Sequence, residues 1–145
     1  MASITKQKIL IVEDEPDTRL FISNLLSTHG YNIVLAETGT EGLRRALAEE
    51  PTVVIIDMMM PNDGGIRLYR DLKRNPKLDR IPVIMLSTIA RKTFFKWQKA
   101  RSSGAGGPPS GADIYLGLPP EADELLLVVD KLSKSESRDR SPALT

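Results

Sequence analysis

Cysteine is absent from the 145 residues, which excludes disulfides, thiolate metal sites and thiol catalysis. Histidine occurs once, as His29, so no site can be built from several imidazoles. His29 precedes Gly30 near a predicted helix end, where an ordinary helix-terminal role is the better interpretation. Neither charge sign predominates: 20 Lys and Arg stand against 19 Asp and Glu, so the net charge of +1 favours neither nucleic acid nor a membrane surface.

Long apolar runs are also missing, because no segment approaches the roughly 20 residues that span a bilayer. The opening stretch "MASITKQKILIVEDE" lacks the pattern of a signal peptide, since its short apolar part ends in acids. We therefore expect a cytoplasmic protein without a membrane partner.

Short apolar segments alternate with segments of helical periodicity. Strands are predicted at residues 8–12, 31–36, 52–56, 81–86 and 113–118. Helices are predicted from Pro16 towards Gly30, from a Thr40 cap to Pro51 with Leu43, Ala46 and Leu47 on one face, from about 66 to 75, and at 121–132. Such alternation predicts an α/β fold, with a parallel sheet covered by helices on both faces.

Two segments do not fit this alternation. Residues 102–111, "SSGAGGPPSG", are too rich in Gly, Pro and Ser for a helix or strand and predict a loop. Residues 133–145, "SKSESRDRSPALT", have little apolar content, so we expect a disordered tail or linker after a domain at residues 1–132.

Polar residues follow three of the predicted strands. Glu13 and Asp14 come after the first strand, Asp57 closes the third, and Ser87 follows the fourth. Carboxyl ends of parallel strands meet at one crevice, where converging acids would fit a hard cation such as Mg²⁺. A carboxylate held there can attack phosphorus to form an acyl phosphate, with the Ser87 hydroxyl bonding a phosphoryl oxygen. The alternative is a set of helix caps and solvated loop charges.

Four stretches in order, "ILIVEDEPDTR", "VVIIDMMMPNDGG", "IPVIMLST" and "GADIYLGLPP", resemble the signatures of response regulator receiver domains, from about Lys8 to Leu132. The resemblance implies a doubly wound, flavodoxin-like sheet with strand order 2-1-3-4-5. It implies that Asp57 is the phosphoacceptor and that Asp14 ligates Mg²⁺ directly, with Glu13 as its partner, directly or through water. Met59 would offer its backbone carbonyl to the metal.

The same resemblance assigns the conformational switch. Ser87 takes the place of the family's switch hydroxyl, and Tyr115 matches the aromatic residue that turns inward on phosphorylation. For Tyr115, a half-buried strand aromatic is an equally good interpretation.

The sequence departs from the family at its fifth strand. Leu118 stands where the family has a lysine, followed by Pro119, and 31 positions separate Ser87 from Leu118, more than is usual. The segment 91–111 is therefore expected to be remodelled, and Arg91 or Lys92 could restore the missing charge. "RKTFFKWQKAR", at 91–101, is either a partner-binding patch or an amphipathic helix with a solvated basic side.

The favoured function is that of a receiver domain, which takes phosphate on Asp57 from a histidine kinase or phosphotransfer protein. We do not expect an enzyme, beyond a domain that assists its own phosphorylation and dephosphorylation. A downstream protein partner would dock on the face of the fourth helix, fifth strand and fifth helix, and a homodimer stays open. The alternative is a phosphorylation-independent pseudo-receiver, favoured by Leu118. A metal-dependent phosphatase is less favoured because nothing supplies its general acid, and nucleic acid binding is weakly supported.

Overall fold

The computed structural model describes residues 7–88 and 113–140. Arg91, Lys92, the basic aromatic stretch 91–101 and the Gly/Pro-rich segment 102–111 lie outside the described residues. The elements in chain order are β1 (Lys8–Val12), α1 (Pro16–Ser27), β2 (Asn32–Ala36), α2 (Gly39–Glu49), β3 (Val53–Asp57), η1 (Pro61–Asp63), α3 (Gly64–Arg74), β4 (Val83–Ser87), β5 (Ile114–Gly117) and α5 (Ala122–Arg140).

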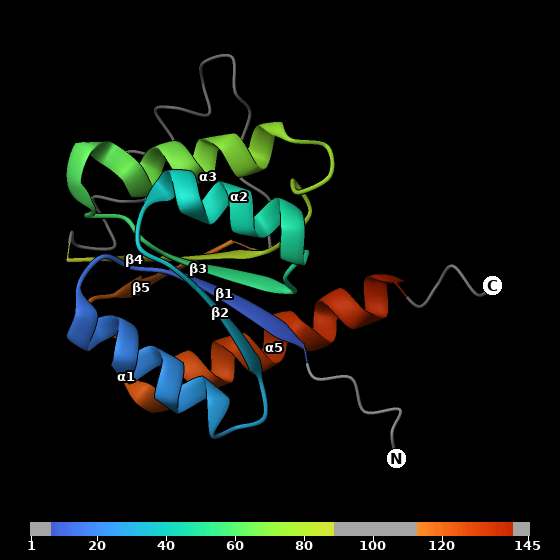
Figure 1. The fold of residues 1–145 in the computed structure, drawn as a ribbon. Coiled ribbons are helices and arrows are strands. Elements are labelled where there is room, and N and C mark those ends of the chain that lie inside the picture. Colours follow the sequence, from blue (N-terminus) through green and yellow to red (C-terminus); the bar gives the residue numbers. More distant parts are fainter. Residues whose placement is uncertain (1–6, 89–112, 141–145) are drawn as a thin grey trace.

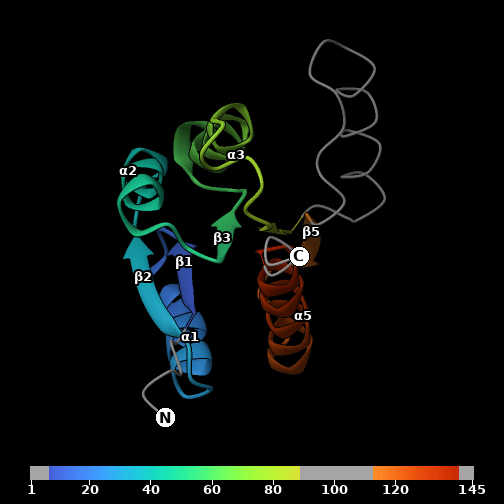
Figure 2. The same cartoon turned by 90° about the vertical axis from the view of Figure 1, so that its right-hand side faces the viewer.

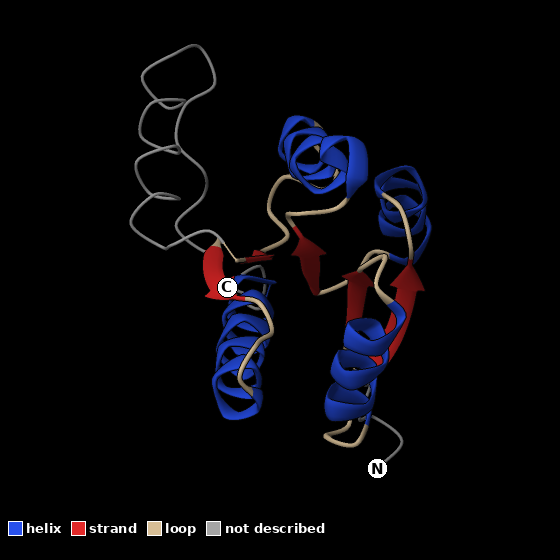
Figure 3. Cartoon of the chain, turned by 90° about the vertical axis from the view of Figure 1, so that its left-hand side faces the viewer, coloured by secondary structure: helices blue, strands red, loops and turns tan. Residues whose placement is uncertain are grey.

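The five strands form one parallel sheet in the order β2-β1-β3-β4-β5, which confirms the predicted fold class. Helices α2 and α3 lie on one face of the sheet, and α1 and α5 lie on the other (Figure 1). The turned views show the same layers, with the strands between two pairs of helices (Figures 2 and 3). None of the described helices combines the length and the apolar character needed to cross a membrane.

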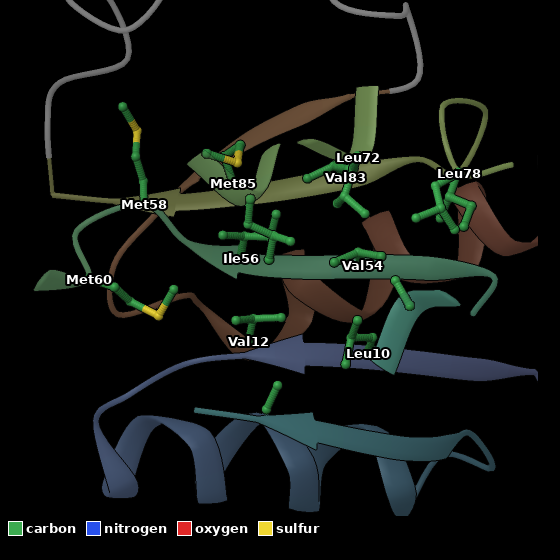
Figure 4. Close-up of a cluster of buried hydrophobic side chains, with 14 of the residues drawn as sticks. Leu10, Val12, Val54, Ile56, Met58, Met60, Leu72, Leu78, Val83 and Met85 are labelled. Atoms are coloured by element: carbon green, nitrogen blue, oxygen red, sulfur yellow. The ribbon is translucent and has the colours of Figure 1, made fainter. Parts of the chain in front are cut away.

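Alternate residues of each strand face opposite helix layers. In β3, Val54 and Ile56 pack towards α2 and α3 (Figure 4), whereas Val53 and Ile55 pack towards α1 and α5. All four are at most 1% exposed, because the middle of a parallel sheet is covered on both sides. This double burial explains why the strand sequences are continuous apolar runs instead of alternating patterns.

Helix α2 begins two residues earlier than predicted, and the prediction of Thr40 as its cap was wrong. Thr38 has an extended backbone, and its side-chain oxygen accepts a hydrogen bond from the Glu41 N–H at 3.1 Å. The Glu41 carboxylate in turn accepts from the Glu37 N–H at 2.9 Å. These two hydrogen bonds resemble a capping box, although the glutamate accepts from the residue before the cap, and they favour the threonine that has a glutamate three residues later. Leu47, predicted to share the inner face, is 44% exposed.

Helix α5 continues to Arg140, beyond the predicted end at Leu132. Residues 133–140, expected to belong to a disordered tail or linker, are thus helical in this structure, and Ser133 itself is 4% exposed. The apolar periodicity ends at Leu132, but residues 133–140 contain neither glycine nor proline, and their lysine, glutamate and arginine residues favour helix.

Candidate functional site

Three carboxylates converge at the carboxyl edge of the sheet, as the sequence predicts. Glu13 and Asp14 directly follow β1, and Asp57 is the last residue of the neighbouring strand β3. One carboxylate oxygen from each residue lies within 4.8 Å of the other two. Glu13 and Asp57 are 1% and 4% exposed, and Asp14 is exposed, so the cluster has a buried floor and one solvent-facing acid.

Glu13 is the most perturbed acid of the cluster. Its Oε2 accepts a hydrogen bond from the Glu15 N–H at 3.1 Å, whereas its buried Oε1 has no hydrogen-bond partner in the described part of the chain. Burial, reinforced by the adjacent Asp57 carboxylate, raises the pKa of Glu13 to about 8. A buried carboxylate that has one oxygen without a donor and lies beside a second carboxylate has the features expected of a cation ligand.

The dimensions of the cluster fit a small divalent cation. Mg²⁺ binds oxygen at about 2.0–2.1 Å, so two of its ligands lie at most roughly 4.2 Å apart. One oxygen of each carboxylate already lies within 4.8 Å of the other two, so a contraction of the cluster would bring all three around such an ion. The Met59 N–H donates to Asp57 Oδ1 at 2.7 Å and thereby fixes the orientation of the carboxylate. The metal contact of the Met59 carbonyl stays a prediction.

The two predicted switch residues lie side by side next to this cluster. Ser87 ends β4, beside β3, and is 1% exposed; its Oγ lies 3.5 Å from Met59 Sδ. Tyr115 on β5 is 6% exposed, and its hydroxyl donates to the Ser87 carbonyl at 3.4 Å. Tyr115 is therefore turned inward in this structure and packs with the cluster on the α2 and α3 side.

Leu118, predicted to occupy the position of the family's lysine, contributes apolar contacts. Its half-buried side chain packs with the apolar cluster on the α1 and α5 side, and a cis peptide bond joins it to Pro119. Among the ion pairs of residues 7–88 and 113–134, none involves Glu13, Asp14 or Asp57. Within the described residues, the cluster thus has three acids and no paired lysine or arginine.

Two residues that support the site were missed by the sequence reasoning. Arg19 of α1 donates from Nη1 to the Glu13 carbonyl at 2.9 Å, and its Nη2 lies 3.8 Å from the Glu37 carboxylate. Gly65 of α3 lies so close to β3 that an added Cβ would stand 2.2 Å from the Asp57 carbonyl oxygen. The two glycines after "MMMPND" are a sequence feature that could have indicated a close approach of two backbone segments. No sequence pattern around Arg19 indicates its contact with the Glu13 carbonyl.

Comparison with known proteins agrees with this geometry. The model of the response regulator receiver domain matches residues 9–107, and the chain belongs to that family. Protein PilH of Pseudomonas aeruginosa is 32% identical over 123 residues, which cover 85% of this chain and 94% of that protein. Histidine kinase P4 of Formosa agariphila is 35% identical over 133 residues, 92% of this chain but only 9% of that protein. The chain is accordingly a receiver domain of two-component signalling.

A solved structure shares the fold at low sequence identity. The receiver domain of sensor histidine kinase PA1611 from Pseudomonas aeruginosa has a TM-score of 0.73 and 23% identity, covering 90% of this chain and 99% of that one. That receiver domain has a magnesium ion coordinated in its active site cleft.

Proposed function

We propose that Asp57 is the phosphoacceptor of this receiver domain and that a histidine kinase or a phosphotransfer protein is the donor. The observation that carries this proposal is the position of Asp57, which is buried at the end of β3 with Glu13 and Asp14 within 4.8 Å. Ser87 ends the adjacent strand. The family membership of the chain supports the same donor class.

The transfer requires little of the protein beyond positioning. A carboxylate oxygen of Asp57 attacks the phosphorus of a phosphohistidine, a new O–P bond forms, the P–N bond breaks and the imidazole leaves. The Met59 N–H orients the attacking carboxylate through Oδ1, at 2.7 Å. The Ser87 hydroxyl, at the end of the next strand, then donates to an oxygen of the transferred group.

Glu13, Asp14 and Asp57, with the Met59 carbonyl, would hold a magnesium ion, and Glu13 could act through a water molecule. Bound there, Mg²⁺ relieves the repulsion between the acids and neutralises charge that develops on the phosphoryl group. The orphaned Glu13 Oε1 supports this assignment, as does the magnesium ion in the PA1611 receiver domain.

Leu118 should weaken the conformational response to phosphorylation. It should affect the transfer of the phosphoryl group to Asp57 less. One hydrogen bond to a charged group contributes roughly 1.5–3 kcal/mol, whereas full conversion between two conformations needs about 5.5 kcal/mol of differential binding. An apolar side chain in place of the ammonium therefore removes a substantial part of the switching energy. The carboxylates that carry the transfer are still present. Compensation by Arg91 or Lys92 stays a prediction.

The output of the domain would be a shape change that a protein partner recognises on the face of β5 and α5. Tyr115 supports this route because it connects the Ser87 carbonyl to β5. The domain would act as a signalling module and not as an enzyme with a substrate of its own.

The direct test is the intact mass of the protein after incubation with Mg²⁺ and acetyl phosphate. We expect the parent to gain one phosphoryl group and Asp57→Asn to gain none. Asp63→Asn is the matched control, because Asp63 is exposed on the same loop and is not part of the acid cluster, so it should gain the group as the parent does. A folded parent without any mass gain would contradict the proposal.

A further inference from the structure

Three consecutive methionines differ sharply in their exposure. Met58 and Met60 are each 5% exposed and pack with the cluster on the α2 and α3 side (Figure 4). Met59, between them, is 49% exposed. Met85, on β4, is 2% exposed, so Met59 is the one exposed methionine of the described residues.

Met59 also contacts the Asp57 carboxylate and the Ser87 hydroxyl of the acceptor site. Its backbone N–H donates to Asp57 Oδ1 at 2.7 Å, and its Sδ lies 3.5 Å from the Ser87 hydroxyl, which donates to it. A thioether is a weak acceptor, so this hydrogen bond can give way when a phosphoryl oxygen arrives. The sulfur therefore lies where a change in its chemistry alters what Ser87 can bind.

We propose that Met59 is a site of reversible oxidation, at which a peroxide suppresses phosphoryl acceptance by Asp57. In the reaction, a lone pair of Sδ attacks one oxygen of the peroxide and the O–O bond breaks. The sulfur gains that oxygen and is oxidised by two electrons to the sulfoxide, and hydrogen peroxide is reduced to water. A methionine sulfoxide reductase reverses the change with electrons from a thiol. The inference rests on the proposed role of Asp57.

The sulfoxide acts on the site in two ways. Its oxygen is a much stronger hydrogen-bond acceptor than the thioether, so it competes with an incoming phosphoryl oxygen for the Ser87 hydroxyl. It also adds a polar atom to the side chain of the residue whose backbone N–H donates to Asp57 Oδ1. Because the chain has no cysteine, no thiol competes for the oxidant.

The first measurement is a peptide map of the folded protein after mild treatment with hydrogen peroxide. We expect Met59 to oxidise well before Met58, Met60 and Met85, since exposure governs the rate. The treated protein is then phosphorylated with Mg²⁺ and acetyl phosphate. Its rate should fall about tenfold or more relative to the untreated protein, the range expected for loss of a hydrogen bond to a charged group. Reductase treatment should restore the original rate.

Each variant serves as its own control before and after peroxide. Met59→Leu keeps the bulk of the side chain without the sulfur, so peroxide should leave its rate, whatever that rate is, unchanged. Met85→Leu removes a buried methionine and should remain as sensitive to peroxide as the parent. Sensitivity that persists in Met59→Leu, or a parent that is phosphorylated equally fast with Met59 fully oxidised, would overturn this inference while leaving the proposed function intact. An untreated parent that takes no phosphoryl group would overturn both.

Discussion

Leu118, which we predict to occupy the position of the family's lysine, directly follows β5 and packs with the α1 and α5 cluster. Leu118 follows Gly117, which pairs with Ser87 at the same edge of the sheet as the three acids, so we expect a lysine at position 118 to bring an ammonium group near that edge. Leu118→Lys loses some apolar packing, but it adds an ammonium group whose attraction to the site should be stronger when Asp57 carries the more highly charged phosphoryl group.

We therefore expect Leu118→Lys to enlarge the response to beryllofluoride, which stands in for the phosphoryl group. The increase in the free energy of unfolding on saturation with Mg²⁺ and beryllofluoride should exceed the parent's increase by roughly 1.5–3 kcal/mol. Urea unfolding with and without the ligands measures both increments. Leu118→Met is the matched control and should behave as the parent does. Equal increments in Leu118→Lys and parent would mean that the charge is supplied elsewhere or is not needed.

Gly65 is the other residue on which the acceptor site depends. A Cβ at this position would lie 2.2 Å from the Asp57 carbonyl oxygen and 2.9 Å from the Met58 Cα, both backbone atoms that cannot move independently. Gly65→Ala should destabilise the fold by roughly 1–3 kcal/mol through overpacking. It should also weaken Mg²⁺ binding, because α3 is pushed away from β3 at Asp57.

Gly117→Ala provides the control for that prediction. Gly117 is the last residue of β5, and nothing lies within 4 Å of the point where its Cβ would stand, so its replacement should change stability by about 0.5 kcal/mol or less. Chemical denaturation compares the two variants, and Mg²⁺ titration compares their affinities. Gly65→Ala with parental stability and affinity would show that the contact between α3 and β3 relaxes freely.

At the scale of elements, a buried carboxylate connects α3 and β4 to the start of β5. Asp113 accepts hydrogen bonds from the Tyr69 hydroxyl at 2.6 Å, from Lys73 Nζ at 3.0 Å and from the Val83 N–H at 3.0 Å. Its side chain is 4% exposed and that of Lys73 is 17% exposed. Burial, together with the Asp113 carboxylate, raises the pKa of Tyr69 strongly, so its hydroxyl stays a donor.

Asp113→Asn should therefore cost roughly 3 kcal/mol of unfolding free energy, because Lys73 is left buried without its countercharge. The surface pair of Lys8 and Glu49 gives the comparison: its side chains are 43% and 33% exposed, and Glu49→Gln should cost less than about 1 kcal/mol. Urea unfolding of the two variants tests the contrast. Similar small losses in both would mean that the carbonyls of Asp79 and Ile81, which already accept from Lys73 Nζ at 3.4 and 3.2 Å, and water are sufficient for the ammonium group.

The sequence predicts the elements and the acid cluster for a physical reason. Strand ends in a parallel sheet share one edge, and the family resemblance places the first and third strands side by side, so Glu13, Asp14 and Asp57 are expected to meet. The end of α5 was missed because apolar periodicity reports which face is buried, and says little about how far a polar helix continues.

Contacts between distant parts of the chain were beyond sequence reasoning. Asp113 and Tyr69 are 44 positions apart, and no sequence pattern around either residue predicts the hydrogen bond between them. Arg19 was missed for the same reason, since its acceptor is a backbone carbonyl and its neighbour Glu37 follows a different strand. Charged residues with such partners look like ordinary surface charges in the sequence.

For the whole molecule, the acid cluster makes stability depend on pH and on metal. The pKa of Glu13 is raised from 4.5 to about 8 in the metal-free folded protein. Between these values the folded chain holds a proton that the unfolded chain has released, so the free energy of unfolding falls as pH rises. Glu15 and Glu49, whose pKa values are lowered by Thr18 and Lys8 respectively, act in the opposite direction and only below about pH 4.5.

Magnesium should reverse this dependence, because a bound cation takes the place of the Glu13 proton and favours the ionised cluster. In EDTA we expect stability to decline from about pH 5 to about pH 8, whereas saturating Mg²⁺ should stabilise the protein most at the upper end of that range. Urea unfolding across the range, in EDTA and in Mg²⁺, measures both trends. Glu13→Gln cannot titrate and should flatten the decline in EDTA. If the parent and Glu13→Gln decline equally, the proton lies on another group, and the acid cluster is not what couples the fold to pH.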